Sequence, residues 1–133
     1  MPIPTTITFP SLKNKVSPEE WQARVTLAAC YRLVAHFGWD DQIANHISLR
    51  VPGPEEHFLL NPFGLMFHEI TASSLVKVDL AGNILSDTDY KINKAGYIIH
   101  SAVHEHRPDA LCVFHTHSTS GMAVSAHRDG LLP

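Results

Sequence analysis

The sequence carries little net charge and no long apolar run, and both absences exclude classes of function. Its 133 residues include 10 Lys and Arg against 13 Asp and Glu, a formal charge of −3 at pH 7. Nucleic-acid-binding proteins usually show a strong basic excess, so we expect no nucleic-acid partner. No apolar run approaches the roughly 20 residues that a membrane-spanning helix needs, so we expect no membrane span.

Cysteine is rare, and nothing at the N-terminus resembles an export signal. Residues 1–15 contain neither the basic segment nor the apolar core of a secretory signal peptide. Cys30 and Cys112 lie in apolar stretches without the spacing of a metal site or a disulfide framework. We interpret both as reduced, buried thiols and expect a cytoplasmic protein.

Histidine, by contrast, is abundant: there are ten, and six of them follow position 99. The remaining composition, 44% hydrophobic and 17% charged, is typical of one globular domain. Because the histidines are dispersed rather than consecutive, a purification tag does not explain them. Each one therefore needs an interpretation from its position.

Sequence patterns predict an arm followed by a domain that begins with a helix. Residues 1–16 contain three prolines and no periodicity, and we expect an extended N-terminal arm before a domain over 17–133. Residues 17–20, Ser-Pro-Glu-Glu, supply an N-cap, a proline at the first helical position and a capping-box glutamate. Apolar residues then recur at helical spacing until Gly38, which predicts a helix over about 18–37.

Sequence patterns in the middle of the chain predict strands followed by a second helix. Period-two patterns predict strands over 46–51 and 57–60, and a hairpin that joins 75–80 to 84–85. The helical period returns over about 94–106. The apolar face expected for this helix consists of Ile98, Ile99, Ala102 and Val103.

One more strand and one more helix complete the predicted order. The apolar run 111–114 is typical of a strand at the centre of a sheet. Ser118 offers an N-cap for a last helix that reaches about residue 127. The order of helices and strands predicts a layered α/β or α+β domain rather than a sandwich or a bundle.

The sharpest chemical motif is His115-Thr116-His117, directly after the apolar run. Residues i and i+2 of an extended segment point to the same face, so the two imidazoles converge. Neutral imidazole binds zinc and other divalent metals, and two donors make half of a tetrahedral shell. The alternative is that both rings bond to the backbone, since the local pattern offers no third ligand.

Two more histidines, His100 and His104, share one face of the predicted helix because they are four residues apart. Taken alone, we interpret one as packed and the other as a surface residue. The sequence has no glycine-rich phosphate loop and no Gly-x-Ser-x-Gly nucleophile motif. Nucleophilic catalysis therefore finds little support.

Two blocks of sequence, FLLNPFGLMFHEITASSLVKVDLAGN (58–83) and NKAGYIIHSAVHEHRPDALCVFHTH (93–117), resemble the class II aldolase/adducin family, and its adducin-like branch above all. The resemblance extends over about 21–127. It implies a three-layer α/β/α domain with a central, mainly antiparallel sheet. Family members are commonly homotetramers with the active site between subunits, so a homo-oligomer is expected.

In catalytic members of the family, three histidines hold a divalent metal, often zinc, and the first two correspond to His115 and His117. The resemblance thus implies a zinc cofactor, or else iron or manganese. The metal polarises a carbonyl group of the substrate, and a nearby glutamate moves the proton. The third histidine and a catalytic tyrosine lie well downstream, so we expect a domain incomplete at its C-terminus.

At other positions that the resemblance assigns to the family's active site, this sequence has different residues. The catalytic glutamate corresponds to Gly96, which cannot transfer a proton. Two phosphate-binding serines correspond to Lys94 and Ala95, and Lys94 could attract an anion as a point charge. An asparagine and a loop glycine near the phosphate correspond to Asn45, within one residue, and to Gly64.

Three hypotheses follow. The chain is a metal-dependent lyase of aldolase type that acts on small carbonyl or sugar-like substrates, with Glu105, His100 or a metal-bound water as its base. Alternatively, it is a non-catalytic, adducin-like domain for binding or assembly. The third hypothesis is a truncated, inactive family member.

Overall fold

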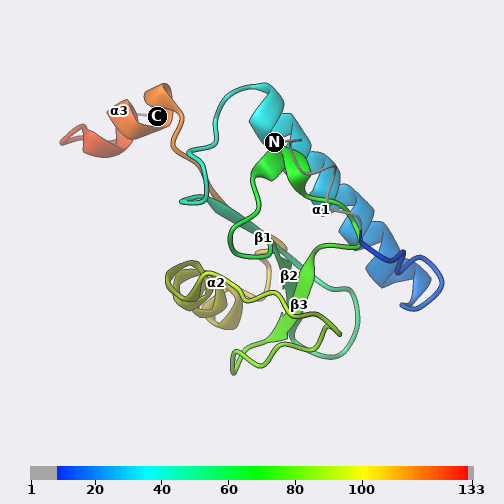
Figure 1. Cartoon of the computed structure of the whole chain (residues 1–133). Helices are drawn as coiled ribbons and strands as arrows, with labels where there is room; N and C mark the ends of the chain where they lie inside the picture. The colour runs from blue at the N-terminus through cyan, green and yellow to red at the C-terminus, as the bar shows by residue number, and fades with distance from the viewer. Residues whose placement is uncertain (1–8, 132–133) are drawn as a thin grey trace, which may run out of the picture.

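The computed structural model describes residues 9–131 and shows three layers, in which a sheet lies between α1 and α2 (Figure 1). The four strands are all antiparallel to their neighbours, in the order β3-β2-β1-β4. The elements in chain order are α1 (Pro18–His36), β1 (His46–Arg50), β2 (His57–Leu60), the 3-10 turn η1 (Phe67–Glu69), β3 (Val76–Asp79), α2 (Lys94–His106), β4 (Cys112–His115) and α3 (Thr119–Ala126). The expected α/β/α class is confirmed.

The first helix has the boundaries that its end signals predict. The Ser17 hydroxyl accepts a hydrogen bond from the Glu20 backbone N–H at 3.1 Å, which satisfies one of the unpaired donors of the first turn. Gly38 ends the helix with φ of +65°, a left-handed conformation that glycine adopts without a steric penalty. No helix among the described residues is both long and apolar enough to cross a membrane.

The main core lies between α1, η1 and the inner face of the sheet. Its centre is the buried Tyr31, whose ring meets Phe67 edge-on with centroids 4.5 Å apart. The Tyr31 hydroxyl accepts hydrogen bonds from the backbone N–H groups of Ile47 (2.9 Å) and Asn61 (3.2 Å). One phenol thereby fixes α1 to the start of β1 and to the end of β2.

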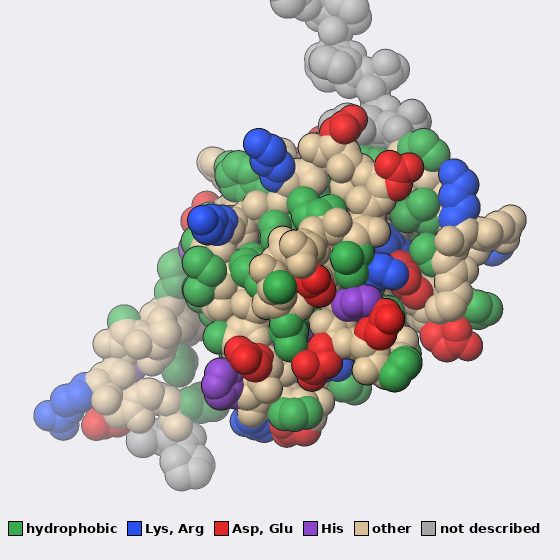
Figure 2. Space-filling model, turned by 90° about the horizontal axis from the view of Figure 1, so that it is seen from below, with side chains coloured by type: hydrophobic (Ala, Val, Ile, Leu, Met, Phe, Trp, Pro, Cys, Tyr) green, Lys and Arg blue, Asp and Glu red, His purple; other side chains and the backbone are tan. Residues whose placement is uncertain are grey.

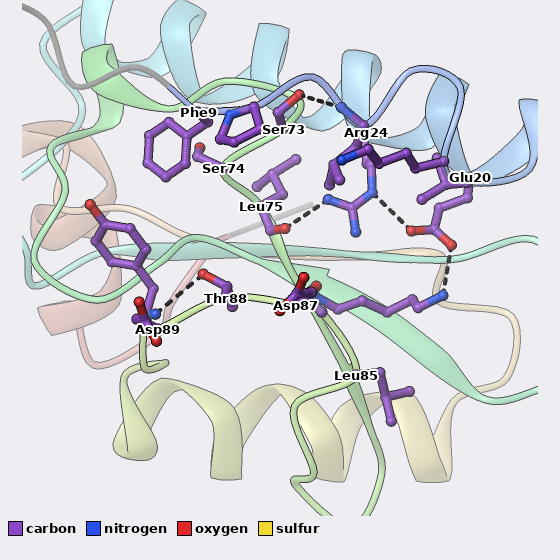
Figure 3. Close-up of a pocket in the computed structure, with 17 residues that line it drawn as sticks. Phe9, Glu20, Arg24, Ser73, Ser74, Leu75, Leu85, Asp87, Thr88 and Asp89 are labelled. Atoms are coloured by element: carbon purple, nitrogen blue, oxygen red, sulfur yellow. Dashed lines mark hydrogen bonds and ion pairs between the residues drawn. The ribbon is translucent and has the colours of Figure 1, made fainter.

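A buried ion cluster ties α1 to the strand on the far edge (Figure 3). Arg24 pairs with Glu20 at 2.9 Å, and Lys77 reaches the same carboxylate at 2.7 Å. Burial alone would raise the pKa of Glu20, but its hydrogen bonds to Lys77 and Arg24 hold that pKa below the ordinary range. A pocket of about 540 Å³ borders this cluster, and no histidine lines it.

Two expectations about the last strand are wrong. The run 111–114 was expected at the sheet centre, but β4 pairs only with β1 among the described strands and forms an edge. Leu111 is accordingly 63% exposed, and Cys112 is exposed rather than buried. Cys30 is half-buried, and both thiols are free.

The expected hairpin after β3 is reduced to one bridge, between Val78 and Ile84. The last helix, by contrast, starts at the predicted cap, where the Ser118 hydroxyl accepts a hydrogen bond from the Gly121 N–H. The expected arm over 1–16 has its first eight residues outside the described part of the chain. Its boundary with the domain stays a prediction.

The buried face of α2 is the reverse of the expected one. Ile98 and Ile99 are 56% and 55% exposed, whereas Gly96, His100 and His104 are buried against the sheet. The helix has the predicted boundaries, but the wrong face was assigned to the core. His104, expected at the surface if His100 was packed, is fully buried as well.

Candidate metal centre

The surface between α2 and β1 is polar on both sides. Residues of a strand point alternately to its two faces, so Ile47 and Leu49 join the core beneath α1 while His46 and Ser48 face α2. On α2, the four-residue spacing of Gly96, His100 and His104 places all three on one face. Polar side chains are therefore buried at this interface, where a helix and a sheet usually pack against each other through apolar side chains.

Hydrogen bonds join these side chains into one continuous line, called here the histidine row: His104, Ser48, His100, His46, His115 and His117. The Ser48 hydroxyl lies 2.8 Å from Nε2 of His104 and 2.7 Å from Nδ1 of His100. His100 Nε2 lies 2.7 Å from His46 Nδ1. His46 Nε2 then lies 3.2 Å from His115 Nδ1, so the row leads from the interior to the predicted metal pair.

The predicted pair converges as the two-residue spacing requires. Nε2 of His115 and Nε2 of His117 lie 3.2 Å apart, and His117 donates its Nδ1–H to the Asp41 carboxylate at 2.9 Å. Two nitrogen ligands about 2.0–2.1 Å from one tetrahedral ion stand about 3.3–3.4 Å apart, so the pair fits a divalent ion such as zinc. A carboxylate behind a ligating ring, as Asp41 lies behind His117, is a usual support of such a site.

The buried rings of the row are neutral at pH 7. Burial, with a smaller effect of His46 and its other neighbours, lowers the pKa of His100 to about 3. Burial and the charge of Arg50 lower the pKa of His104 to about 4. Burial likewise lowers the pKa of His46 to about 4 and, together with the neighbouring His117, lowers that of His115. Neutral imidazole is the form that binds a metal.

Gly96, to which the family resemblance assigns the catalytic glutamate, lies directly against the ring of His46. A Cβ atom on Gly96 would lie 2.5 Å from Cδ2 of His46 and 2.8 Å from its Nε2, too close for any side chain. The His46 ring therefore fills the space that a side chain at position 96 would need. Glutamate at this position and the present place of His46 exclude each other.

The three predicted substrate-binding residues lie in different surroundings. Asn45 is buried beside the row, and its Oδ1 accepts a hydrogen bond from the Asp41 N–H, while its Nδ2 has no partner among the described residues. Gly64 lies in an exposed turn with φ of +96°, and Lys94 is exposed at the first turn of α2.

These positions are linked through their neighbours. The Phe63 N–H donates to the Lys91 carbonyl at 2.7 Å, which holds the turn of Gly64 against the segment that leads into α2. His46, next to Asn45, contacts the first turn of the same helix. Lys94 itself lies in the first turn of α2, where the Asn93 side chain already accepts hydrogen bonds from the N–H groups of Ala95 and Gly96.

Sequence reasoning missed three members of the site: His46, Ser48 and Asp41. The sequence did contain a signal for His46 and Ser48. Together with Arg50 they alternate with apolar residues, which marks one face of β1 as polar. Glu105, a candidate base, is exposed beside His106 and outside the row. No cluster of three or more metal-binding side chains occurs between residues 9 and 131, so the pair lacks a third ligand there.

The family model of the class II aldolase and adducin N-terminal domain matches residues 25–133. The chain belongs to this family. Alpha-adducin of Mus musculus is 54% identical over 112 residues, which make up 83% of this chain and 15% of adducin. A Caulobacter vibrioides protein whose name places it provisionally in aldolase class 2 is 68% identical over 92% of this chain and 48% of its own length.

The chain is also similar in structure to a named enzyme. The L-fuculose 1-phosphate aldolase of Glaciozyma antarctica superimposes with a TM-score of 0.74 and 34% identity, over 92% of this chain and 49% of that chain. This chain spans about half the length of the bacterial curated relatives that it matches. Since the relatives include aldolases and adducins, membership of the family does not by itself assign catalysis.

Lowering the pH from 7 to 5 is expected to destabilise the fold. Unfolded histidine takes up a proton below its ordinary pKa of 6.5, whereas folded His100 and His104 stay neutral until their lowered pKa values of about 3 and 4. In between, the unfolded chain binds more protons, so the free energy of unfolding falls by about 1.4 kcal/mol per pH unit for each ring. Urea denaturation at pH 7, 6 and 5 measures this slope.

His106, exposed on the same helix, offers the control for this prediction. His106→Gln should keep the wild-type slope, and His104→Gln should flatten it. Carboxylates contribute equally to the pH dependence of both variants. The difference between the two slopes therefore measures the contribution of the buried His104 ring alone. A free energy of unfolding that stays constant or rises towards pH 5 would contradict a neutral histidine row.

Gly96→Ala is expected to destabilise the protein. Alanine usually stabilises a helix interior by about 0.5–1 kcal/mol relative to glycine. Here its Cβ would overlap the His46 ring, and overpacking of this kind costs about 1–3 kcal/mol. Thermal denaturation should show a lower Tm for Gly96→Ala and little change for Ser101→Ala on the same helix. An unchanged or higher Tm for Gly96→Ala would mean that His46 does not occupy this space.

Proposed function

We propose that His115 and His117 supply two ligands of a divalent-metal centre, most simply zinc, in a lyase of class II aldolase type. The observation that carries this proposal is the 3.2 Å separation of the two Nε2 atoms, with each ring anchored from behind through Nδ1. The substrates would be small carbonyl or sugar-like compounds, in line with the sugar-phosphate substrate named for the structural relative.

A bound divalent ion would polarise a substrate carbonyl and stabilise negative charge on its oxygen. The chain's own residues would hold the ligands in place: Asp41 orients His117, and His46 orients His115. Proton transfer by residue 96 is impossible, so a proton-transferring group has to come from another position. A third ligand is also needed and is absent from residues 9–131.

Substrate anions would bind at the N-terminus of α2. Lys94 is exposed there and carries a positive charge, and the turn of Gly64 lies beside the preceding segment. Asn45 would contribute its unpaired Nδ2 once a ligand or a small shift of the chain gives that atom a partner. The positive charge of Lys94 would suit a substrate that carries a phosphate or a carboxylate.

The proposal includes a cytoplasmic homo-oligomer. Figure 2 shows apolar side chains at the surface among acidic ones, and the C-terminal segment projecting from the body. The exposed apolar residues of α2, β4 and α3 include Ile98, Ile99, Phe114 and Met122, and α3 buries none of its residues. Apolar surface of this extent favours association, as the family resemblance implies.

A second candidate function is adducin-like binding or assembly without catalysis. It is favoured by Gly96 and the His46 ring that takes up its space, because together they exclude the family's acid/base side chain. The 54% identity to alpha-adducin points the same way. A bound metal without turnover of any 2-keto or hydroxy-aldehyde substrate would favour this candidate, or an inactive family member, over the lyase.

Metal analysis of the purified chain tests the first candidate. After incubation with Zn²⁺ and removal of excess ion at pH 7.5, mass spectrometry should find close to one zinc per chain. His115→Ala should lose it, whereas the exposed His106→Ala should keep it. Bound zinc should also leave below about pH 6, because protonated imidazole cannot bind a metal. No zinc in the wild-type chain would contradict the proposed centre.

A further inference from the structure

A polar pocket lies on the face of the sheet opposite the histidine row. Lys77 alternates along β3 with Val76 and Val78, which pack on the α2 side, so its side chain reaches the other face, towards α1. The pocket there has a volume of about 540 Å³, and its walls include residues of the segments 9–16 and 85–90 (Figure 3). It shares no residue with the histidine row.

The most buried wall of this pocket carries a net positive charge. Two cations, Arg24 and Lys77, pair there with one carboxylate, Glu20, and each of its oxygens already accepts from one of them. Nη2 of Arg24 has no hydrogen bond to any residue between 9 and 131 and points away from the Glu20 partner of Nε (Figure 3). The Lys77 side chain is 24% exposed and makes one hydrogen bond. Both cations therefore keep N–H donors for a ligand.

Three hydroxyl groups add further donors. The oxygens of Ser73, Ser86 and Thr88 accept hydrogen bonds from backbone N–H groups at 3.1, 2.7 and 3.2 Å. All three residues line the pocket, and no hydrogen bond within the described part of the chain uses their O–H groups. Together with the two cations they supply several donors and one net positive charge, which suits a carboxylate.

The other walls suit a cation and an apolar group. Asp87 and Asp89, on either side of Thr88, are exposed and line the pocket. Their charges would repel a second anionic group on a ligand and attract an ammonium group. Apolar side chains supply much of the remaining lining: Phe9, Leu12, Val16, Leu75, Leu85 and Tyr90.

We propose that this pocket is a binding site for a small zwitterion, namely an amino acid with a large apolar side chain. Its carboxylate contacts Lys77 and Nη2 of Arg24, and its ammonium group lies against Asp87 and Asp89. The volume is within the usual range of about 300–1,000 Å³ for small-molecule sites and leaves room for the apolar side chain. The site is separate from the proposed metal centre and does not depend on it.

Isothermal titration calorimetry of the full 133-residue chain with L-phenylalanine tests the site. EDTA in the buffer keeps the histidine pair free of metal, which would itself bind an amino acid. We expect saturable one-to-one binding of L-phenylalanine. Binding should be weaker for 3-phenylpropionate, which lacks the ammonium group, and for phenethylamine, which lacks the carboxylate.

Two results with the wild-type chain would overturn the proposal. One is the absence of saturable binding up to the solubility limit of L-phenylalanine. The other is an affinity for either analogue that equals or exceeds the affinity for L-phenylalanine, because the pocket would then not recognise both charges of a zwitterion.

Lys77→Met locates the bound carboxylate. Methionine keeps the apolar stem of lysine and removes its charge, so the affinity for L-phenylalanine should fall about tenfold or more, as expected for one lost hydrogen bond to a charged group. Lys91→Met removes an exposed lysine outside the pocket and should leave the affinity unchanged. An unchanged affinity in Lys77→Met, or an equal loss in both variants, would contradict the site.

Thr88→Val is a second variant, which removes one hydroxyl donor and keeps every charge. It should also weaken the binding of L-phenylalanine, and an affinity equal to that of the wild-type chain would contradict the role of this hydroxyl. If neither Lys77→Met nor Thr88→Val folds, the comparison of the three compounds with the wild-type chain decides the proposal.

Discussion

Hydrogen bonds between α2 and β1 hold the candidate site in place, because both facing surfaces carry polar side chains. A buried polar atom without a partner destabilises the folded state by about 1–3 kcal/mol, so burial of His100 and His104 requires partners for their ring nitrogens. Ser48 and His46 supply three of these partners. The ends of the row therefore fix both the position of α2 on the sheet and the orientation of His115.

The same packing bears on position 96, where the family resemblance expects a glutamate and this chain has glycine. The helix approaches β1 closely enough for the His46 ring to occupy the space beside Gly96. A catalytic carboxylate and this arrangement are sterically incompatible. The protein thus combines a pair of rings suited to a metal with a glycine at the position that the family resemblance assigns to the proton carrier, so that both an aldolase-like and an adducin-like function have a feature in their favour.

Local signals in the sequence predicted the elements well. The Ser17 and Ser118 caps, the boundaries of α2 and the convergence of His115 with His117 all depend on residues close in sequence. The burial of α2 did not follow from such signals. Hydrophobic periodicity assigned Ile98 and Ile99 to the core, but the buried face is decided by hydrogen bonds to residues more than fifty positions away.

The position of β4 illustrates a second limit. A continuous apolar run predicts a central strand, because the side chains of a central strand are covered on both faces of the sheet. Here the strand is at the edge of the described sheet, and its apolar residues are partly exposed. Asp41 was missed for a similar reason, since it lies in a turn and meets His117 through long-range contacts: the pairing of β1 with β4 and the hydrogen bond from the His117 N–H to the Trp39 carbonyl.

X-ray absorption at the zinc edge of the zinc-loaded chain tests the central claim most directly, because it counts the ligands of the bound ion. We predict two imidazole nitrogens at about 2.0–2.1 Å, with oxygen at the remaining positions. A first shell without imidazole, or with sulfur from Cys112, would show that zinc binds elsewhere and that His115 and His117 do not form the centre.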